Sequence, residues 1–307
     1  MNRQNIVTFL LISYFLVIIG LMLINNVSIT PDRIFIFLLF LAIILGRLKT
    51  FLRDWLPFLA LLLAYEMLRG FADSYFTVHV AGLLKLEKFI FFGYLPTEVL
   101  QDLFYKAGTI GWQDVAATVI YFLHFPLPLA MAFYLWLKHK QQYYRFVIAL
   151  LVLSFSGFIT FLLFPAAPPW YAAKEGLISI TKISTLVVDR LSWTWNLSYY
   201  YSHLNPNQVA AMPSLHAAYP TLVLLGLWRV SKRAFWVFLP YPPLVWLSTI
   251  YLGEHYAIDA AAGAAYAFAS YWLIYNFTSV KKFVLNLRPT NLLKQVRALR
   301  LRKDNEN

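Results

Sequence analysis

The stretch that decides the fold runs from Gly253 to Thr278 and reads GEHYAIDAAAGAAYAFASYWLIYNFT. Its apolar part, from Tyr256 onward, is long enough to cross a hydrocarbon core of about 30 Å as a helix. Two ionisable side chains stand where this apolar run begins. His255 and Asp259 are four residues apart, so on a helix they share one face and the carboxylate can hold one imidazole nitrogen. That arrangement fixes the tautomer and leaves the other nitrogen nucleophilic or basic.

The composition identifies a polytopic membrane protein. Of the 307 residues, 60% are hydrophobic and 13% are charged, so an ordinary soluble domain would expose a largely apolar surface. Cysteine is absent, which excludes disulfides, cysteine nucleophiles and thiolate metal sites. The net charge of +12 does not indicate nucleic acid as a partner, because the basic residues lie between apolar runs and in the tail.

Eight apolar runs predict an all-α chain of membrane helices. They comprise residues 6–24, 34–46, 55–71, 115–137, 144–164, 215–228, 234–252 and 256–278. The first run follows only five residues and shows no cleavage site, so we expect a retained span. The second run is the shortest, and arginines at its ends can extend it by snorkelling.

The basic residues predict the orientation of these helices. If every span is real, four basic segments fall on one side of the membrane, which the positive-inside rule makes the cytoplasm. These segments are Arg47 to Arg53, Lys138 to Arg145, Arg229 to Arg233 and the tail from Lys281 to Lys303. Both termini are then cytoplasmic, and His216 and His255 lie at the extracytoplasmic face, which we expect to be that of the plasma membrane.

Two linkers and the tail complete the chain. Residues 78–105 are amphipathic and too charged to span, which predicts a segment lying in the membrane interface. Residues 165–211 are aromatic and polar, as expected either of a lid facing the substrate or of an interfacial anchor. The tail, residues 279–307, is basic and suits a surface of anionic lipid.

Histidines at these positions suit phosphoryl transfer between two alcohols. The reaction needs a nucleophile, a group that protonates the leaving oxygen, and positive or N–H dipoles around the phosphate. We assign His255 as the nucleophile, Asp259 as its orienting carboxylate and His216 as the general acid and base. Both histidines are expected in the first turn of a helix, where free N–H groups suit an anion. Ser214 can cap its helix, contact the phosphate, or both.

These residues resemble a known family. Pro213-Ser214-Leu215-His216, followed by His255-Tyr256-x-x-Asp259, is similar to the second and third motifs of the type 2 phosphatidic acid phosphatase superfamily. The Leu after Ser214 and the upstream segment Ala167-Pro168-Pro169-Trp170-Tyr171 resemble its inositol phosphorylceramide synthase branch. The resemblance implies a six-helix catalytic core over residues 55–278, preceded by two accessory helices in residues 1–54. It also implies metal-free transfer or hydrolysis of lipid phosphate without a cofactor.

Departures from the family pattern favour transfer over hydrolysis. The first motif, a Lys and an Arg-Pro pair, has no counterpart near residues 164–171, and Ser248-Thr249 replaces the Ser-Arg of the third. Fewer cations suit a singly charged phosphodiester. We therefore expect a headgroup to move from a phospholipid donor to a lipid alcohol such as ceramide or diacylglycerol. Alternatives are a lipid phosphate or polyprenyl diphosphate phosphatase and, in another class, a transporter or lipid-handling protein.

The sequence leaves the residue that meets the phosphate charge open. Arg69 is one candidate, although it can instead form a structural pair with Glu66 on the same helix face. Lys174 and Arg190 are others, and Trp170 and Tyr171 are expected to contact the substrate. His124 is expected to be a packed histidine near a proline kink. A metal site built from the two histidines and Asp259 is conceivable but lacks further acidic ligands.

Overall fold

The computed structural model describes residues 13, 31–69, 76–191 and 209–276. Helices make up about three quarters of this part of the chain, and its only strand-like pairing is two isolated bridges, which link His79 to Ala166 and Ala166 to Ala210. The all-α prediction is confirmed. The helices are α2 (Pro31–Ile44), α3 (Leu48–Arg69), α4 (Ala81–Ile90), α5 (Pro96–Phe104), α6 (Trp112–Phe122), α7 (Pro126–Lys138), α8 (Lys140–Leu163), α9 (Pro169–Lys174), α10 (Ile183–Leu191), α12 (Leu215–Val230), α13 (Lys232–Phe238), α14 (Tyr241–Tyr251) and α15 (Ala257–Asn276).

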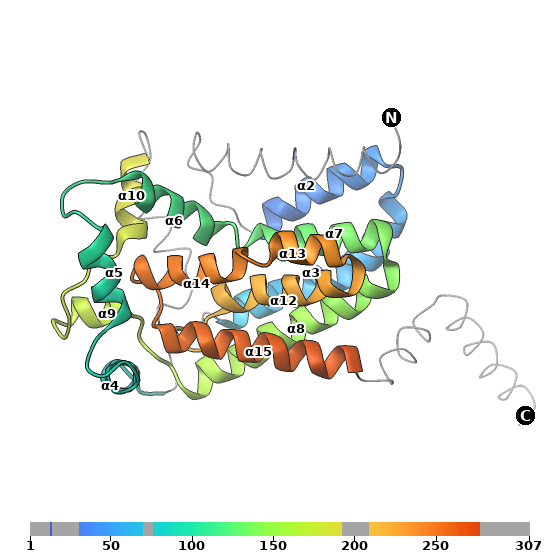
Figure 1. The fold of residues 1–307 in the computed structure, drawn as a ribbon. Coiled ribbons are helices and arrows are strands. Elements are labelled where there is room, and N and C mark those ends of the chain that lie inside the picture. Colours follow the sequence, from blue (N-terminus) through green and yellow to red (C-terminus); the bar gives the residue numbers. More distant parts are fainter. Residues whose placement is uncertain (1–12, 14–30, 70–75, 192–208, 277–307) are drawn as a thin grey trace, which may run out of the picture.

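The long helices form a bundle, and the short helices α4, α5, α9 and α10 gather at one end of it (Figure 1). Apolar side chains point outward from the bundle, as with Phe40 at 58% exposed, Met67 at 75% and Trp272 at 67%. An apolar exterior of this kind suits lipid as the surrounding medium. The first predicted span, residues 6–24, lies outside the described residues.

By length and composition alone, two described helices, α8 and α15, suffice to cross a membrane. The α6–α7 pair makes a third span if it counts as one helix bent by 46°. The predicted helix over residues 115–137 is therefore divided into two helices, and the break lies at the proline kink that the sequence indicated. Pro126 begins α7, and proline lacks an N–H donor and clashes with a continuing helix before it. The run over residues 234–252 is also divided, into α13 and α14, at Leu239 and Pro240.

Close packing of α12 on α15 sets the position of the site. A Cβ atom added to Gly263 of α15 would lie 2.1 Å from the carbonyl oxygen of Ser214, so only glycine permits this approach. The Ser214 N–H donates to the carbonyl of Asp259 at 3.0 Å. The first turns of the two helices are therefore joined through their backbones.

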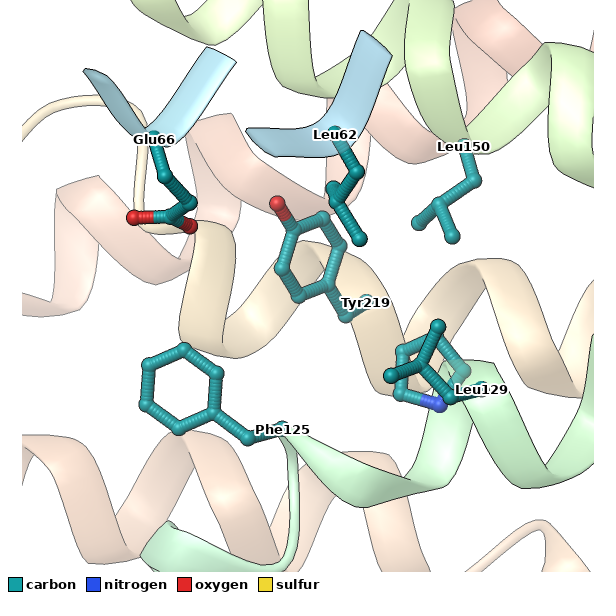
Figure 2. Close-up of a pocket in the computed structure, with 7 residues that line it drawn as sticks. Leu62, Glu66, Phe125, Leu129, Leu150 and Tyr219 are labelled. Carbon is teal, nitrogen blue, oxygen red and sulfur yellow. The ribbon is translucent and has the colours of Figure 1, made fainter. Parts of the chain in front are cut away.

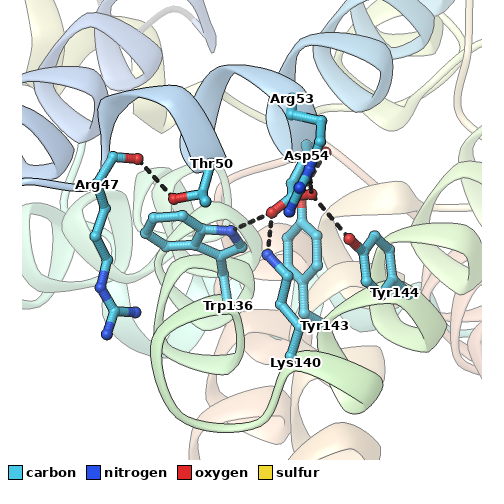
Figure 3. Close-up of polar contacts among 8 residues, drawn as sticks. All are labelled: Arg47, Thr50, Arg53, Asp54, Trp136, Lys140, Tyr143 and Tyr144. Atoms are coloured by element: carbon cyan, nitrogen blue, oxygen red, sulfur yellow. Dashed lines mark hydrogen bonds and ion pairs between the residues drawn. The ribbon is translucent and has the colours of Figure 1, made fainter. Parts of the chain in front are cut away.

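A polar cluster closes the opposite end of the bundle (Figure 3). The Asp54 carboxylate, whose side chain is 2% exposed, accepts hydrogen bonds from Trp136 Nε1 at 2.9 Å and Tyr144 Oη at 2.8 Å. Lys140, the first residue of α8, pairs with the same carboxylate. These contacts fasten α3 to the end of α7 and the start of α8, whereas α8 ends near the site.

Candidate active site

The structure brings His216, His255 and Asp259 together. His216 Nδ1 lies 2.8 Å from His255 Nε2, and His255 Nδ1 lies 3.5 Å from Asp259 Oδ2. Asp259 is fully buried, His255 is 4% exposed and His216 is partly exposed. A buried carboxylate at one nitrogen of His255 leaves the other nitrogen, Nε2, as the reactive one, and it faces His216.

Tyr121 extends this chain of contacts on the far side of His216. Its hydroxyl lies 2.9 Å from His216 Nε2, and the two rings stack with centroids 4.7 Å apart. One tautomer satisfies every contact: Tyr121 donates to His216 Nε2, His216 Nδ1–H donates to His255 Nε2, and His255 Nδ1–H points to Asp259. In this tautomer His216 carries its proton on the nitrogen that faces His255.

Local sequence explains how α12 presents His216. Ser214 is buried and caps α12, accepting from the Ala217 N–H at 3.3 Å. His216 therefore stands in the first turn, as predicted. Ser214 uses its hydroxyl oxygen as a cap, and the carbonyl of the same residue accepts from Ala218.

The sequence predicted His255 in the first turn of a helix with free N–H groups, and the N-terminus of α15 has neither feature. His255 precedes α15, which begins at Ala257, so the prediction that His255 lies in a first helical turn is wrong. The N–H groups there are also taken: Tyr256 donates to Asp259 Oδ2 at 2.9 Å, and Ala257 and Ile258 donate to the Glu87 carboxylate. Two carboxylates fill this helix end, and a phosphate would be repelled from it.

The described part of the 165–211 segment forms a wall of the site. Gln101, which is 6% exposed, donates to the carbonyls of Thr181 and Tyr251 at 2.8 and 2.9 Å and accepts from the Thr181 N–H. Ile183 N–H donates to Leu252. These bonds hold the segment against the turn before His255. Residues 192–208 of the segment lie outside the described part of the chain.

Trp170 of α9 contacts the same turn. Its backbone N–H donates to Gly253 at 3.1 Å, and the Lys182 ammonium lies 4.1 Å from the centre of its indole ring. Lys182 Nζ is also 3.8 Å from a carboxylate oxygen of Glu254, the residue before His255. Tyr171 packs beside Trp170, with ring centroids 5.7 Å apart. The sequence indicated both aromatic residues but gave no sign of Lys182.

The cations named from the sequence lie elsewhere or are not described. Arg69 is the last residue of α3, and its side chain lies outside the described part of the structure. Arg190 is exposed on α10, and Lys174 is exposed with its ammonium 6.0 Å from the Tyr171 ring. Among the residues that the structure describes, no group of three His, Cys, Asp or Glu side chains is arranged so that it could hold a metal ion.

His124 lies closer to the site than the sequence indicated. It is 1% exposed in the break between α6 and α7, and its ring centroid is 4.2 Å from that of His216. Its Nδ1 contacts the Tyr121 carbonyl. His124 is thus a packed histidine near Pro126, as predicted, but it packs against the proposed general acid.

A small cavity of about 30 Å³ lies between α3, α7, α8 and α12, on one side of Phe125. Phe125 lines it and also contacts the His216 ring, with centroids 6.1 Å apart. Figure 2 shows Glu66 of α3 and Tyr219 of α12 facing this space among apolar side chains. The full lining consists of Leu62, Glu66, Phe125, Pro128, Leu129, Leu150 and Tyr219. The cavity holds about one water molecule and is too small for a lipid chain.

The helical bundle with its paired histidines and buried aspartate is similar to what the sequence motifs led us to expect of a lipid phosphate enzyme, and a comparison with protein families identifies the class. Residues 81–273 match the model of the PAP2 superfamily, and the chain belongs to that superfamily. It is therefore a membrane enzyme of the lipid phosphotransferase or phosphatase type.

Individual relatives carry names that are more specific than the name of the superfamily. A phosphoinositol dihydroceramide synthase of Bacteroides thetaiotaomicron is 30% identical over 238 residues, which cover 74% of this chain and 77% of the relative. An inositol phosphorylceramide synthase of Candida albicans is 28% identical over 180 residues, or 56% of this chain and 37% of that protein. The catalytic subunit of the same enzyme in Saccharomyces cerevisiae is 31% identical over 110 residues, or 34% and 27%. No solved structure matches the chain.

Proposed function

We propose that this enzyme moves an inositol phosphate headgroup from a phospholipid donor to a ceramide-type lipid alcohol through a phosphohistidine. The observation that carries the proposal is the contact of His255 Nε2 with His216 Nδ1 at 2.8 Å, with Asp259 behind His255. The names of the bacterial and fungal relatives support this headgroup and this acceptor.

In the first step, the phosphate takes the place of the hydrogen bond between the two imidazoles. His255 Nε2 attacks phosphorus, a P–N bond forms, and the P–O bond to the donor's glycerol oxygen breaks. His216 enters this step as an imidazolium, with its Nε2–H donating to the Tyr121 hydroxyl, and gives its Nδ1 proton to that oxygen. The oxygen leaves as the hydroxyl of a diacylglycerol, and His216 becomes neutral. Asp259 stabilises the positive charge on His255 and keeps Nε2 directed at phosphorus.

In the second step, the acceptor hydroxyl replaces the diacylglycerol. His216 takes its proton at Nδ1, and the oxygen attacks phosphorus while the P–N bond breaks. His255 returns to its neutral form, and His216 regains the proton that it lost. The hydroxyl of Tyr121 holds His216 Nε2 throughout, so the proton is exchanged on the nitrogen that faces the substrate.

Lys182 is the cation best placed to meet the phosphate charge. The N-terminus of α15 is filled by carboxylates, so the anion needs a positive group from another element. Lys182 is held between Glu254 and Trp170, on the two segments that flank the catalytic turn. Contacts with a carboxylate and an indole ring hold the lysine side chain next to the turn that carries His255.

We assign the site to the extracytoplasmic face, with both termini cytoplasmic and the enzyme in the plasma membrane. Arg53 and Lys140 lie in the polar cluster at the opposite end of α8 from the histidines. Basic residues gather on the cytoplasmic side of membrane proteins, which supports this orientation.

The test uses purified protein in mixed micelles with phosphatidylinositol labelled at phosphorus and with ceramide. We expect a new labelled sphingolipid from the wild type and from His79→Ala, which removes an exposed histidine, but none from His255→Ala. Without ceramide, the wild-type protein should accumulate an acid-labile label on histidine. Release of label only into water-soluble products would make the enzyme a phosphatase and overturn the transferase proposal. Label movement that survives in His255→Ala would overturn the mechanism.

A further inference from the structure

We propose that Glu87 is a positioning residue for the reaction: it caps the catalytic helix α15 from a distant part of the chain and holds His255 and Asp259 in register. This inference rests on the proposed function, because its kinetic consequences require His255 to be the nucleophile. Nothing in the local sequence around Glu87 marks it as part of the site.

The geometry is that of a helix cap supplied by a residue that is distant in the sequence. Glu87 Oε1 accepts from the Ala257 N–H at 2.8 Å, and Oε2 accepts from the Ile258 N–H at 3.1 Å. The side chain is fully buried. The side chain of Tyr256, the residue before α15, does not accept from the Ala257 or Ile258 N–H groups. The backbone N–H of Tyr256 itself donates to Asp259. Both oxygens of one carboxylate therefore satisfy donors that α15 leaves open.

Apolar packing keeps Glu87 in this place. Its neighbours Leu83 and Leu84 on α4 are 2% and 7% exposed and belong to one buried cluster with Tyr256, the residue after His255. The other face of α4 is open, with Phe89 82% exposed and Phe92, just beyond the helix, 92% exposed. One side of α4 thus packs on the catalytic turn, and the other suits the membrane interface.

A neutral side chain could cap α15 without the free-energy cost of burying a charge. The presence of a carboxylate here therefore suggests that its negative charge has a role in the reaction. Burial raises the pKa of the Glu87 carboxyl, the two backbone donors act in the opposite direction, and the negative charge of Asp259 raises the pKa further. Two carboxylates at one helix end repel each other unless a positive charge forms nearby. In the proposed mechanism that charge forms on His255, when its Nε2 bonds to phosphorus. Glu87 therefore orients the turn and adds negative potential where the intermediate is cationic.

The test compares Glu87→Gln with Glu98→Gln, the same substitution on the neighbouring helix α5. We expect Glu87→Gln to lower kcat roughly tenfold, about the value of a hydrogen bond to a charged group, while KM for both lipids stays within about twofold. The acid limb of its pH–rate profile should move to lower pH, because less negative charge near His255 favours the neutral imidazole. Glu87→Asp should restore part of kcat, and Glu98→Gln should match the wild type.

A second measurement separates this inference from the proposed function. Backbone hydrogen exchange of residues 256–260 should accelerate in Glu87→Gln and remain at the wild-type rate in Glu98→Gln, whatever reaction the enzyme performs. Unchanged exchange together with an unchanged pH profile would overturn the role of Glu87. A wild-type protein without transferase activity, but with the expected change in exchange, would instead refute the proposed function and leave the capping contact standing. Glu87→Gln could instead show a lower kcat, an acid limb of the pH–rate profile at the wild-type position, and faster hydrogen exchange throughout the protein. That combination would mean that Glu87 has only a structural role.

Discussion

Replacing Asp259 by asparagine removes one buried negative charge while preserving the size of the side chain. In the wild type, Oδ2 accepts from the Tyr256 N–H at 2.9 Å and lies 3.5 Å from His255 Nδ1. An asparagine oxygen can still accept from Tyr256. The same oxygen then faces His255 Nδ1 without a negative charge, so the variant keeps the contact but loses most of the attraction to the positive charge that forms on His255.

The distance sets the size of the expected effect. At 3.5 Å and an effective dielectric constant of about 20, opposite unit charges attract by about 5 kcal/mol. That value is an upper limit, since a hydrogen bond to a charged group contributes about 1.5 to 3 kcal/mol. We expect kcat to fall roughly 100-fold, with each factor of ten corresponding to about 1.4 kcal/mol.

The assay is transfer of labelled headgroup phosphate to ceramide by purified Asp259→Asn, with Asp102→Asn, an exposed carboxylate on α5, as the matched control. Single-turnover experiments without ceramide should show slower formation of phosphohistidine. Thermal unfolding of both variants checks that the bundle is intact. If Asp259→Asn folds normally and keeps more than about a third of the wild-type kcat, the argument that this carboxylate orients His255 is refuted, because even a weak charged hydrogen bond predicts a larger loss.

Three further predictions follow from other contacts. Lys182→Met should reduce kcat/KM for the labelled phospholipid at least tenfold in the same transfer assay, whereas Lys174→Met, on exposed α9, should not. Gly263→Ala should lower the unfolding temperature sharply in thermal denaturation because its Cβ meets the backbone carbonyl of Ser214. Gly82→Ala, whose added Cβ would make only an ordinary contact with His79 at 3.9 Å, should keep or raise it. The pKa of Glu87 is raised above its ordinary value of 4.5, so the folded state binds the proton more tightly than the unfolded state. As pH rises through the range just above 4.5, the free energy of unfolding measured by chemical denaturation should therefore fall more in the wild type than in Glu87→Gln. An identical pH dependence of the two proteins would contradict the raised pKa.

Local sequence was sufficient for the helices and for one half of the site. The apolar run over residues 144–164 matches α8, because a long apolar stretch whose one charged residue, Arg145, stands at its end is stable across a bilayer only as a helix. The spacing of His255 and Asp259 predicted their contact, although His255 lies before α15 and not within it. The turn still brings the pair together, because Asp259 holds the Tyr256 N–H.

Proline breaks were visible in the sequence, but their consequence was not. Pro126 indicated a kink, yet only the fold shows that the break turns His124 and Tyr121 toward His216. The direction of a bend depends on the helices that surround it, and periodicity carries no information about them. For the same reason, an apolar run divided at Pro240 looked like a single span.

The sequence by itself determined that this chain is a helical membrane protein and which three side chains are candidates for chemistry, because apolar length and histidine–carboxylate spacing act over a few residues. Only the tertiary structure decided what surrounds them. Glu87 lies 170 residues from Ala257, and Gln101 lies 150 from Tyr251. Contacts across such separations arise from the packing of whole helices, so no local pattern encodes them. The capped end of α15 and the placement of Lys182 are consequences of that packing, and in the proposed reaction they set where the phosphate binds.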